Sequence, residues 1–253
     1  MTTRETSRHR PAAHGARHDS RTLVAQIGLV AGAALCYFGV RGLTQSGVAE
    51  ARENAERLVS VERAIGISWE EAIQSAIIGL DWLVAVINWV YIYGHWPVVI
   101  IAMVALFLHR PDRYYLLRNA MFISGAIGLL IFALVPVAPP RFGILELVDT
   151  VTERSSSYRA LQPPGLINRY AALPSLHFGW NLLVGVILWE VGRSRVMKAF
   201  AVAMPCAMAL AVVATGNHFV LDVFAGGLVA LAGLALALAL PRVRPTPDWA
   251  LPR

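Results

Sequence analysis

The stretch ATGNHFVLDVFAGGLVALAGLALALAL, residues 214–240, places a histidine and an aspartate at the head of an apolar run. From Phe219 to Leu240 the run is long enough to cross the roughly 30 Å of hydrocarbon in a bilayer as a helix. Asp222 is the only charged residue within it. Burying an ionisable side chain in a membrane helix is unfavourable unless something compensates, so Asp222 is a candidate functional residue.

Six further apolar runs alternate with short charged breaks along the chain. They are Leu23–Leu43, Ala72–Tyr93, Trp96–His109, Leu117–Val137, Ser175–Val191 and Val196–Thr215. The runs are continuous rather than alternating, which favours helices over a barrel. The composition agrees, since 57% of the residues are hydrophobic, 15% are charged and the mean hydropathy is +0.56. The sequence therefore predicts an all-α, polytopic transmembrane helix bundle of about six to seven spans, because the run Trp96–His109 is short for a span.

The remaining segments are polar. Residues 1–21 lack hydrophobic periodicity, and we expect a disordered tail there. Residues 242–253 form a second polar tail, and residues 22–241 are expected to form one membrane-embedded domain. Val48–Gly66 spaces its apolar residues as a helix does, among arginines and glutamates, which predicts one amphipathic helix lying at the membrane interface.

The net charge of +6 does not indicate a nucleic-acid partner, because the arginines lie in tails and loops rather than on one face. They suit contacts with anionic lipid headgroups instead. Cys36 and Cys206 lie within apolar runs, where we expect small buried hydrophobes rather than a disulfide. The lipid bilayer is thus the expected partner, and the sequence indicates no oligomeric state.

Counting the runs gathers four polar segments on one membrane face. They are the GHWP turn at 94–97, APPR at 138–141, PSLH at 174–177 and GNH at 216–218. The charged loops 110–118 and 192–198 fall on the other face, which the positive-inside tendency makes cytoplasmic, although the arginines of the N-terminal tail favour the opposite orientation. We expect a multi-pass protein of a bacterial plasma membrane, with the motif-bearing face pointing out of the cytoplasm.

His218 and Asp222 lie four residues apart and share one face of a helix, so the carboxylate can hold the imidazole in one tautomer. Such an imidazole can attack phosphorus and form a phosphohistidine. His177, at the start of another apolar helix, can protonate the leaving alcohol and later activate the acceptor. Ser175 and the amides that follow Pro174 suit a phosphate, because helix starts attract anions.

Two motifs carry a family resemblance. Pro174, Ser175, Leu176 and His177 match a Pro-Ser-x-His helix start, while Gly216, Asn217, His218 and Asp222 match a small polar turn followed by His-x-x-x-Asp. In these motifs the sequence resembles the PAP2 (type 2 phosphatidic acid phosphatase) superfamily, and within it the branch that includes inositol phosphorylceramide synthases. The resemblance covers roughly residues 88–235. It implies that His218 is the nucleophile, Asp222 its orienting partner and His177 the general acid and base. Ser175 and Asn217 are then expected to bind the substrate.

A further likeness concerns the GHWP turn. Tyr91 and His95 lie four residues apart and are similar to a Tyr-x-x-x-His element of the synthase-like branch, which implies that they line the headgroup pocket. The alternative is an aromatic belt residue next to a histidine with an ordinary hydrogen-bond partner.

The sequence also departs from the pattern of many phosphatases in the superfamily, which carry a lysine in a first motif and an arginine six residues before the nucleophile. The sole lysine here is Lys198, on the opposite face, and the position of the arginine is occupied by Val212. Arg141 is therefore our candidate for the phosphate clamp, since a guanidinium grips phosphate oxygens in a fork. A snorkelling interfacial arginine is the alternative. These departures favour a phosphotransferase acting on a phospholipid or a polyprenyl or other lipid phosphate, with a lipid phosphate phosphatase as the alternative.

Two other classes remain open. A zinc site on His177, His218 and Asp222 would use the same residues, but no thiolate takes part and a helix start suits an anion better. A non-enzymatic membrane transporter would be marked by broken helices in two related halves, and the sequence shows no such halves. We therefore expect an enzyme that needs neither a metal nor a cofactor.

Overall fold

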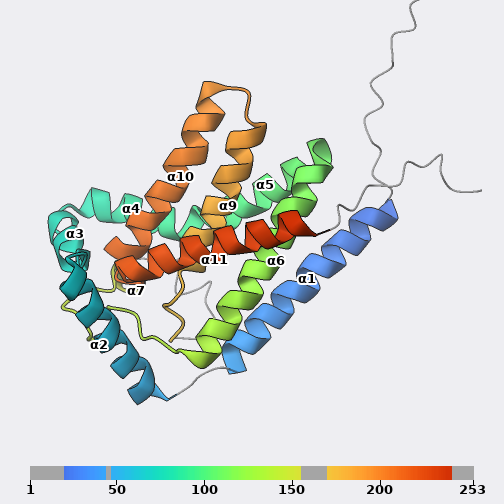
Figure 1. Ribbon diagram of the computed structural model, residues 1–253. Coiled ribbons are helices and arrows are strands. Elements are labelled where there is room, and N and C mark those ends of the chain that lie inside the picture. Colours follow the sequence, from blue (N-terminus) through green and yellow to red (C-terminus); the bar gives the residue numbers. More distant parts are fainter. Residues whose placement is uncertain (1–19, 44–46, 155–169, 241–253) are drawn as a thin grey trace, which may run out of the picture.

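The computed structural model describes residues 20–43, 47–154 and 170–240 (Figure 1). In this part of the chain the regular elements are helices, which confirms the all-α prediction. They are α1 (Ser20–Leu43), α2 (Val48–Ile65), α3 (Glu70–Ile77), α4 (Asp81–Tyr93), α5 (Trp96–His109), α6 (Pro111–Leu134), α7 (Thr150–Arg154), α9 (Leu176–Val191), α10 (Arg195–Ala214) and α11 (Val220–Ala239). The tails expected at 1–21 and 242–253 lie outside the described residues, except that α1 begins at Ser20.

Three single helices, α6, α10 and α11, are long and apolar enough to cross a membrane. A fourth span results if α4 and α5, which are bent by 45° at their junction, count as one broken span. The apolar helices α9 and Thr22–Cys36 within α1 are shorter. By length and composition the described residues thus offer three to four spans, fewer than the six to seven that we expected.

Part of the difference arises in the run Ala72–Tyr93, which is not one span because it is divided between α3 and α4 at Gly79. Glycine is a poor helix former, and the acidic Asp81 at the first position of α4 suits a helix start. The run Trp96–His109 forms α5, which continues α4 through the bend. Hydropathy could not reveal these breaks, since the chain stays apolar on both sides of them.

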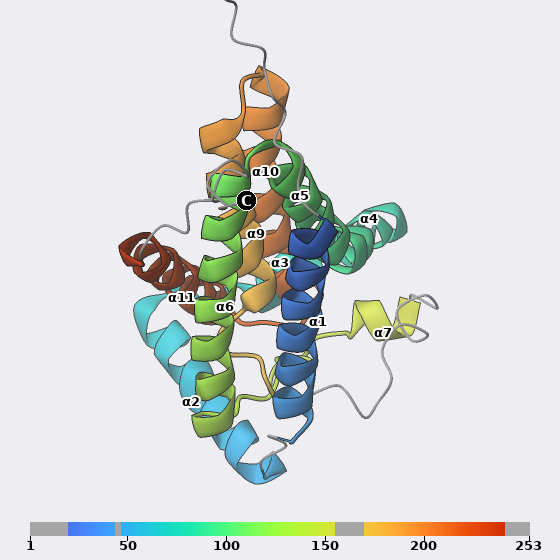
Figure 2. The same ribbon diagram turned by 90° about the vertical axis from the view of Figure 1, so that its right-hand side faces the viewer.

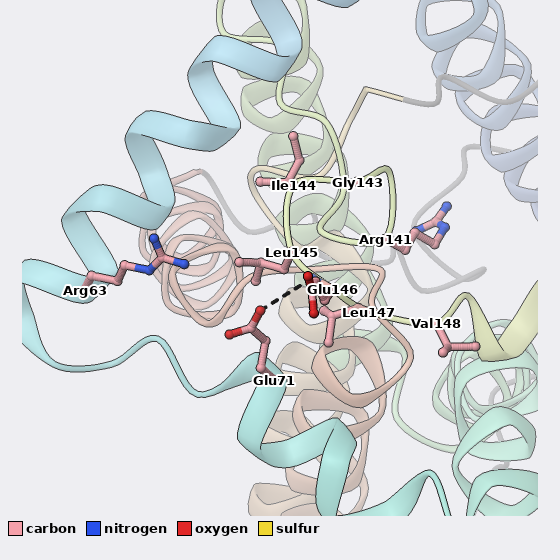
Figure 3. Close-up of a pocket in the computed structure, with 9 residues that line it drawn as sticks. All are labelled: Arg63, Glu71, Arg141, Gly143, Ile144, Leu145, Glu146, Leu147 and Val148. Atoms are coloured by element: carbon pink, nitrogen blue, oxygen red, sulfur yellow. Dashed lines mark hydrogen bonds between the residues drawn. The ribbon is translucent and has the colours of Figure 1, made fainter.

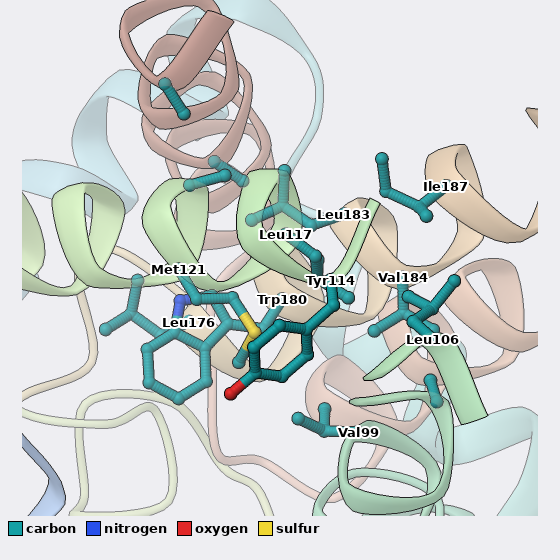
Figure 4. Close-up of a cluster of buried hydrophobic side chains, with 14 of the residues drawn as sticks. Val99, Leu106, Tyr114, Leu117, Met121, Leu176, Trp180, Leu183, Val184 and Ile187 are labelled. Atoms are coloured by element: carbon teal, nitrogen blue, oxygen red, sulfur yellow. The ribbon is translucent and has the colours of Figure 1, made fainter. Parts of the chain in front are cut away.

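The buried centre of the bundle is formed by α5, α6, α9 and α11. Figures 1 and 2 show α1 alongside α6, while α9 and α10 run as an antiparallel pair. α11 packs against both α6 and α9. Leu117, Trp180, Leu183 and Ile187 are among the buried side chains that these helices share (Figure 4). Burial of this apolar surface fixes where α9 and α11 place their first turns.

The outward faces of the apolar helices are also apolar. Ile101, Leu134 and Leu228 are 68%, 68% and 70% exposed. A surface of this kind would be an aggregation hazard in water and suits contact with lipid tails. Cys36 and Cys206 are likewise exposed, so the expectation that they are buried was wrong.

The amphipathic helix expected at Val48–Gly66 is present as α2. Its apolar face is buried, and its opposite face carries two exposed arginine–glutamate pairs at helical spacing. Figures 1 and 2 place α2 at one end of the bundle. One residue of α2 departs from the simple amphipathic pattern, because Glu62 is completely buried.

The start of α9 lies directly against α11 because the two helices meet at glycines. A β-carbon at Gly226 would lie 2.2 Å from the carbonyl oxygen of Ser175, and a β-carbon at Gly179 would lie 2.6 Å from the carbonyl oxygen of Gly226. The amide of Ser175 donates to the carbonyl of Asp222 at 2.9 Å. Close backbone approach at Gly226 therefore sets the spacing between the two histidine motifs.

We expect Gly226→Ala to lower turnover by about 10²-fold, because a displacement of about 1 Å in a reacting group has an effect of that size. The added methyl group cannot fit beside the Ser175 carbonyl, so the two helices must move apart. Gly227→Ala is the matched control, since its β-carbon would chiefly meet the ring edge of Phe178 at 3.2 Å, a side chain that can shift. Steady-state rates of the two purified variants make the comparison, and equal rates would contradict the role given to Gly226.

Candidate active site

Three loop segments meet where α9 and α11 begin. The amide of Val137 donates to the carbonyl of Tyr170, and the amide of Ala172 donates back to the carbonyl of Val137. The amide of Arg141 donates to the carbonyl of Gly216 at 3.1 Å. These backbone bonds tie the end of α6 to the segments that precede α9 and α11. They bring the predicted motifs together at one end of the bundle.

Lys198 lies at the other end. It belongs to the first turn of α10, after the turn that joins α9 to α10, and its ammonium group lies 5.2 Å from the ring centroid of Trp189. This placement agrees with the expectation that Lys198 is remote from the motif residues.

His218 is held by two acceptors on the same ring nitrogen. Its Nδ1 lies 2.7 Å from the carbonyl oxygen of Ala172 and 3.3 Å from Oδ2 of Asp222. Since both partners can only accept while Asp222 is ionised, Nδ1 carries the proton and the lone pair lies on Nε2. We expected the carboxylate of Asp222 to orient the ring. The backbone carbonyl of Ala172 also orients it, and makes the shorter contact. The same Oδ2 also accepts the amide of Phe219 at 2.8 Å.

His177 faces His218 across a short gap, with ring centroids 6.2 Å apart. Two contacts of about 3 Å that meet at one phosphoryl group span a gap of this size. The two rings come from the starts of α9 and α11, as the motifs predicted. The geometry therefore permits both imidazoles to act at a single phosphorus atom.

Tyr91 and His95 pack against His177. The ring of Tyr91 is stacked on that of His177 with centroids 5.1 Å apart, and the His95 ring lies 4.5 Å away. The side-chain amide of Asn181 donates to the carbonyl of His177 at 2.8 Å and lies 3.0 Å from Nδ1 of His95. Tyr91 and His95, which were predicted to line the headgroup pocket, thus contact the second histidine itself. Asn181 was not predicted, because a buried asparagine inside an apolar run gives no indication of its partner.

Arg141 lies beside the turn that carries His218. One guanidinium nitrogen, Nη1, donates to Oδ1 of Asn217 at 2.6 Å, and Nε lies 2.9 Å from Oδ2 of Asp149 without the alignment of a hydrogen bond. Asn217 in turn donates to the hydroxyl of Thr215 at 2.8 Å. The arginine chosen as phosphate clamp is therefore linked to the motif asparagine, and Asp149 offsets part of its charge.

A surface pocket of about 680 Å³ lies on the outer side of the same loop. Arg63, Glu71 and Arg141 line it together with Gly143–Val148, and the guanidinium of Arg141 points away from its centre (Figure 3). The two histidines are not among its lining residues, so we do not assign the phosphate to it.

Ser175 lies in the expected position at the start of α9. Its Oγ is buried and has no hydrogen-bond partner among the described residues. An unsatisfied buried hydroxyl is unfavourable, and a ligand oxygen at this helix start would satisfy it. Arg169, five residues before Pro174, lies outside the described residues.

The start of α11 is already occupied by carboxylates. The amides of Phe219, Val220 and Leu221 each donate to a different carboxyl group, from Asp222, Glu70 and Glu62. These three amides are therefore taken, and the helix-start attraction for phosphate expected at Ser175 has no counterpart at the start of α11. Glu62 and Glu70 were missed by the sequence analysis, since glutamates are common on amphipathic helices.

Within the described residues, no group of three or more histidine, cysteine, aspartate or glutamate side chains is placed to hold a metal ion. His177, His218 and Asp222 thus do not form a three-ligand cluster there.

The fold and the site together define the class of this protein. It is a helical bundle with membrane-spanning segments, in which two histidines and a carboxylate lie together at one end. The profile of the PAP2 superfamily matches residues 56–236, and the chain therefore belongs to that superfamily. The match begins earlier than the resemblance in the motifs, and it includes Glu62 and Glu70.

No curated protein sequence matches the chain. Among solved structures it is similar to the crystal structure of Aquifex aeolicus LpxE, with a TM-score of 0.54 and 18% identity, covering 68% of this chain and 93% of that chain. At this level of identity the likeness shows a shared fold.

Proposed function

We propose that this protein is a membrane-embedded phosphatase that removes the phosphate from a lipid phosphate through a phosphohistidine on His218. The observation that carries this proposal is the pair of imidazoles 6.2 Å apart, one of them held with its Nδ1 toward Ala172 and Asp222. That arrangement supplies a nucleophile and a second proton-transferring group at one phosphorus atom.

In the first step, Nε2 of His218 attacks phosphorus and the bond from phosphorus to the lipid oxygen breaks. His177 gives its proton to that oxygen, so the lipid leaves as a neutral alcohol. Positive charge develops on the His218 ring as the bond to phosphorus forms, and Asp222 stabilises it.

In the second step, water attacks the phosphohistidine and the bond from phosphorus to Nε2 breaks. His177, which is now neutral, takes a proton from the attacking water. Inorganic phosphate leaves and His218 regains its lone pair. The two residues end in the state in which they began, so no external reductant, oxidant or metal ion is needed for the balance.

The phosphate oxygens are met by Arg141 and by the first turn of α9, with Asn217 orienting the guanidinium through its 2.6 Å hydrogen bond. Ser175 is the nearest candidate for a hydroxyl donor, because its buried Oγ has no partner among the described residues. A guanidinium and a hydroxyl together favour a phosphate dianion, as in the monoester of a lipid alcohol.

Val212 stands where many phosphatases of the superfamily carry an arginine, and this departure is compatible with hydrolysis. Val212 is buried in an apolar cluster, and its carbonyl accepts the amides of Asn217 and His218. The motif is thus supported by the backbone at this position, and Arg141 offers a cation from another loop. The departures that favoured a phosphotransferase therefore do not require an alcohol as acceptor.

The orientation proposed from the sequence is kept. Arg113, Arg195 and Lys198 lie at the ends of helices remote from the two histidines, and the positive-inside tendency makes that side cytoplasmic. The substrate is then a lipid phosphate in the outer leaflet of the membrane.

The test is incubation of the purified protein in mixed micelles with phosphatidic acid or a polyprenyl phosphate, with and without an added polyol. Release of inorganic phosphate without the polyol supports the phosphatase. A polyol phosphate monoester that forms only with the polyol, without phosphate release, would assign the protein to the transferases. The same assay with a chelator is expected to give an unchanged rate.

A further inference from the structure

Three consecutive amides at the start of α11 are held by three carboxyl groups from three helices. Phe219 donates to Asp222 of α11 at 2.8 Å, Val220 to Glu70 of α3 at 2.8 Å and Leu221 to Glu62 of α2 at 2.7 Å. All three carboxyl groups are completely buried. Figure 1 shows α2 and α3 meeting beside the start of α11. We call Glu62 and Glu70 the carboxyl clamp.

The carboxyl clamp supplies hydrogen-bond acceptors and negative charge to the start of α11. The first amides of a helix have no acceptor within it, and its dipole places partial positive charge there. A side-chain cap usually comes from the residue just before the helix, but that position is occupied by Phe219. The clamp therefore replaces a local cap with two side chains 150 and 159 residues away in sequence.

Hydrogen bonds from Gln74 attach α3 to the active-site loops. The side-chain amide of Gln74 donates to the carbonyls of Val148 and Ala214, each at 3.0 Å, and its oxygen accepts the amide of Val148. Ala214 is the last residue of α10, just before the turn that carries the nucleophile. Glu70 thus acts from a helix that is bound to the same turn.

Resting on the proposed function, we propose that Glu62 and Glu70 are positioning residues that fix the first turn of α11, and with it His218, and that Glu62 acts as the protonated member of the pair. His218 immediately precedes the three amides of Phe219–Leu221, and Asp222, its carboxylate partner, directly follows them. Any movement of this turn changes the distance from His218 to His177.

The protonation of Glu62 follows from its surroundings. Glu70 of α3 and Asp222 of α11 are the charged groups that act on it. Burial, and then the charges of these two neighbours, raise the pKa of Glu62 to about 8, against the lowering effect of the Leu221 amide. As a carboxylate, Glu62 would leave its Oε2 without a partner, whereas a proton on Oε2 can be donated to Glu70.

The sign of the pH effect follows by linkage. In the unfolded chain Glu62 loses its proton near its ordinary value of 4.5, so the folded protein holds one more proton between pH 4.5 and about 8. The stabilisation is fully present below pH 4.5 and is lost as the pH rises toward 8. Above that pH, a second negative charge beside Glu70 and Asp222 loosens the first turn of α11, so activity should fall on the alkaline side.

The experiment compares Glu62→Gln, Glu62→Ala and Glu70→Gln with the control Glu53→Gln, an exposed position on the same helix. Glutamine imitates a protonated glutamate, so Glu62→Gln should keep kcat at pH 7 within about threefold and lose the alkaline decline. Glu62→Ala should lower kcat by about 10²-fold with little change in KM. Glu70→Gln should move the alkaline midpoint to lower pH, because the charge that favours protonation of Glu62 is gone.

A second readout does not depend on turnover. Hydrogen-exchange protection of the 219–221 amides should fall about tenfold or more in Glu62→Ala and stay near the wild-type value in Glu62→Gln and Glu53→Gln. A wild-type pH profile for Glu62→Gln, or unchanged protection in Glu62→Ala, would overturn the proposal. If the wild type hydrolyses no lipid phosphate, the proposed function fails, and the exchange measurement still decides whether the clamp holds the turn.

Discussion

Replacement of His218 by alanine is expected to lower kcat for lipid phosphate hydrolysis by at least about 10³-fold, because the covalent route then has no nucleophile. The imidazole is held by the Ala172 carbonyl, which is not a nucleophile, and by Oδ2 of Asp222, which also accepts the amide of Phe219. KM should change little, since phosphate binding is assigned to Arg141 and the start of α9. The rate of phosphate release from phosphatidic acid in mixed micelles measures the effect.

The control is His109→Ala, an exposed histidine at the end of α5 whose Nδ1 contacts the carbonyl of Ala105. It should keep wild-type activity. Rapid quenching with labelled substrate adds a direct test, since a phosphohistidine survives alkali and is lost in acid. Such a label should appear in the wild type and be absent in His218→Ala. Label that persists in this variant would show that another residue carries the phosphoryl group.

The pairing of His218 with Asp222 is the part of the site that the sequence predicted most directly. Their spacing of four residues fixes a common helix face, so a pattern in the sequence was enough to pair them. His177 could be joined to them because apolar runs end at one membrane face, and the 6.2 Å gap agrees with that placement. The spacing of residues along a helix and the number of membrane crossings between two motifs can both be read from a single sequence.

Contacts between distant segments could not be predicted in this way. The Ala172 carbonyl holds His218 over 46 residues of sequence, and every residue has a carbonyl, so nothing in the sequence distinguishes this one. Glu62 and Glu70 reach α11 over 159 and 150 residues. On an amphipathic helix, a buried glutamate and an exposed one have the same sequence signature until the partner is known.

The described residues offer fewer spans by length and composition than expected for a related reason. Hydropathy measures how apolar a run is, and it does not measure where the helix bends. The break at Gly79 and the 45° bend between α4 and α5 both lie inside apolar sequence. The bend has a consequence for the site, since it places Tyr91 before the turn and His95 within it, both against His177.

The last prediction separates the two steps assigned to His177. We expect His177→Gln to lower hydrolysis of a lipid phosphate by about 10² to 10⁴-fold, the range typical of general acid–base catalysis. The loss should be smaller for formation of the phosphoenzyme from p-nitrophenyl phosphate, because p-nitrophenolate leaves without needing a proton. The second step still needs a base to activate water, and that base is missing in the variant.

The variant should therefore release a burst of p-nitrophenol equal to the amount of enzyme and then turn over slowly, while the phosphohistidine on His218 accumulates. The wild type and the control His109→Gln should show a smaller burst and less trapped label than His177→Gln, since their second step is not impaired. The burst and the trapped label can be measured in one rapid-quench experiment. An equal loss on both substrates, with no phosphoenzyme, would mean that His177 positions the phosphate and does not transfer the proton. Tyr91, which stacks on His177, and His95, whose ring lies 4.5 Å from it, would then be residues that line the phosphate-binding site.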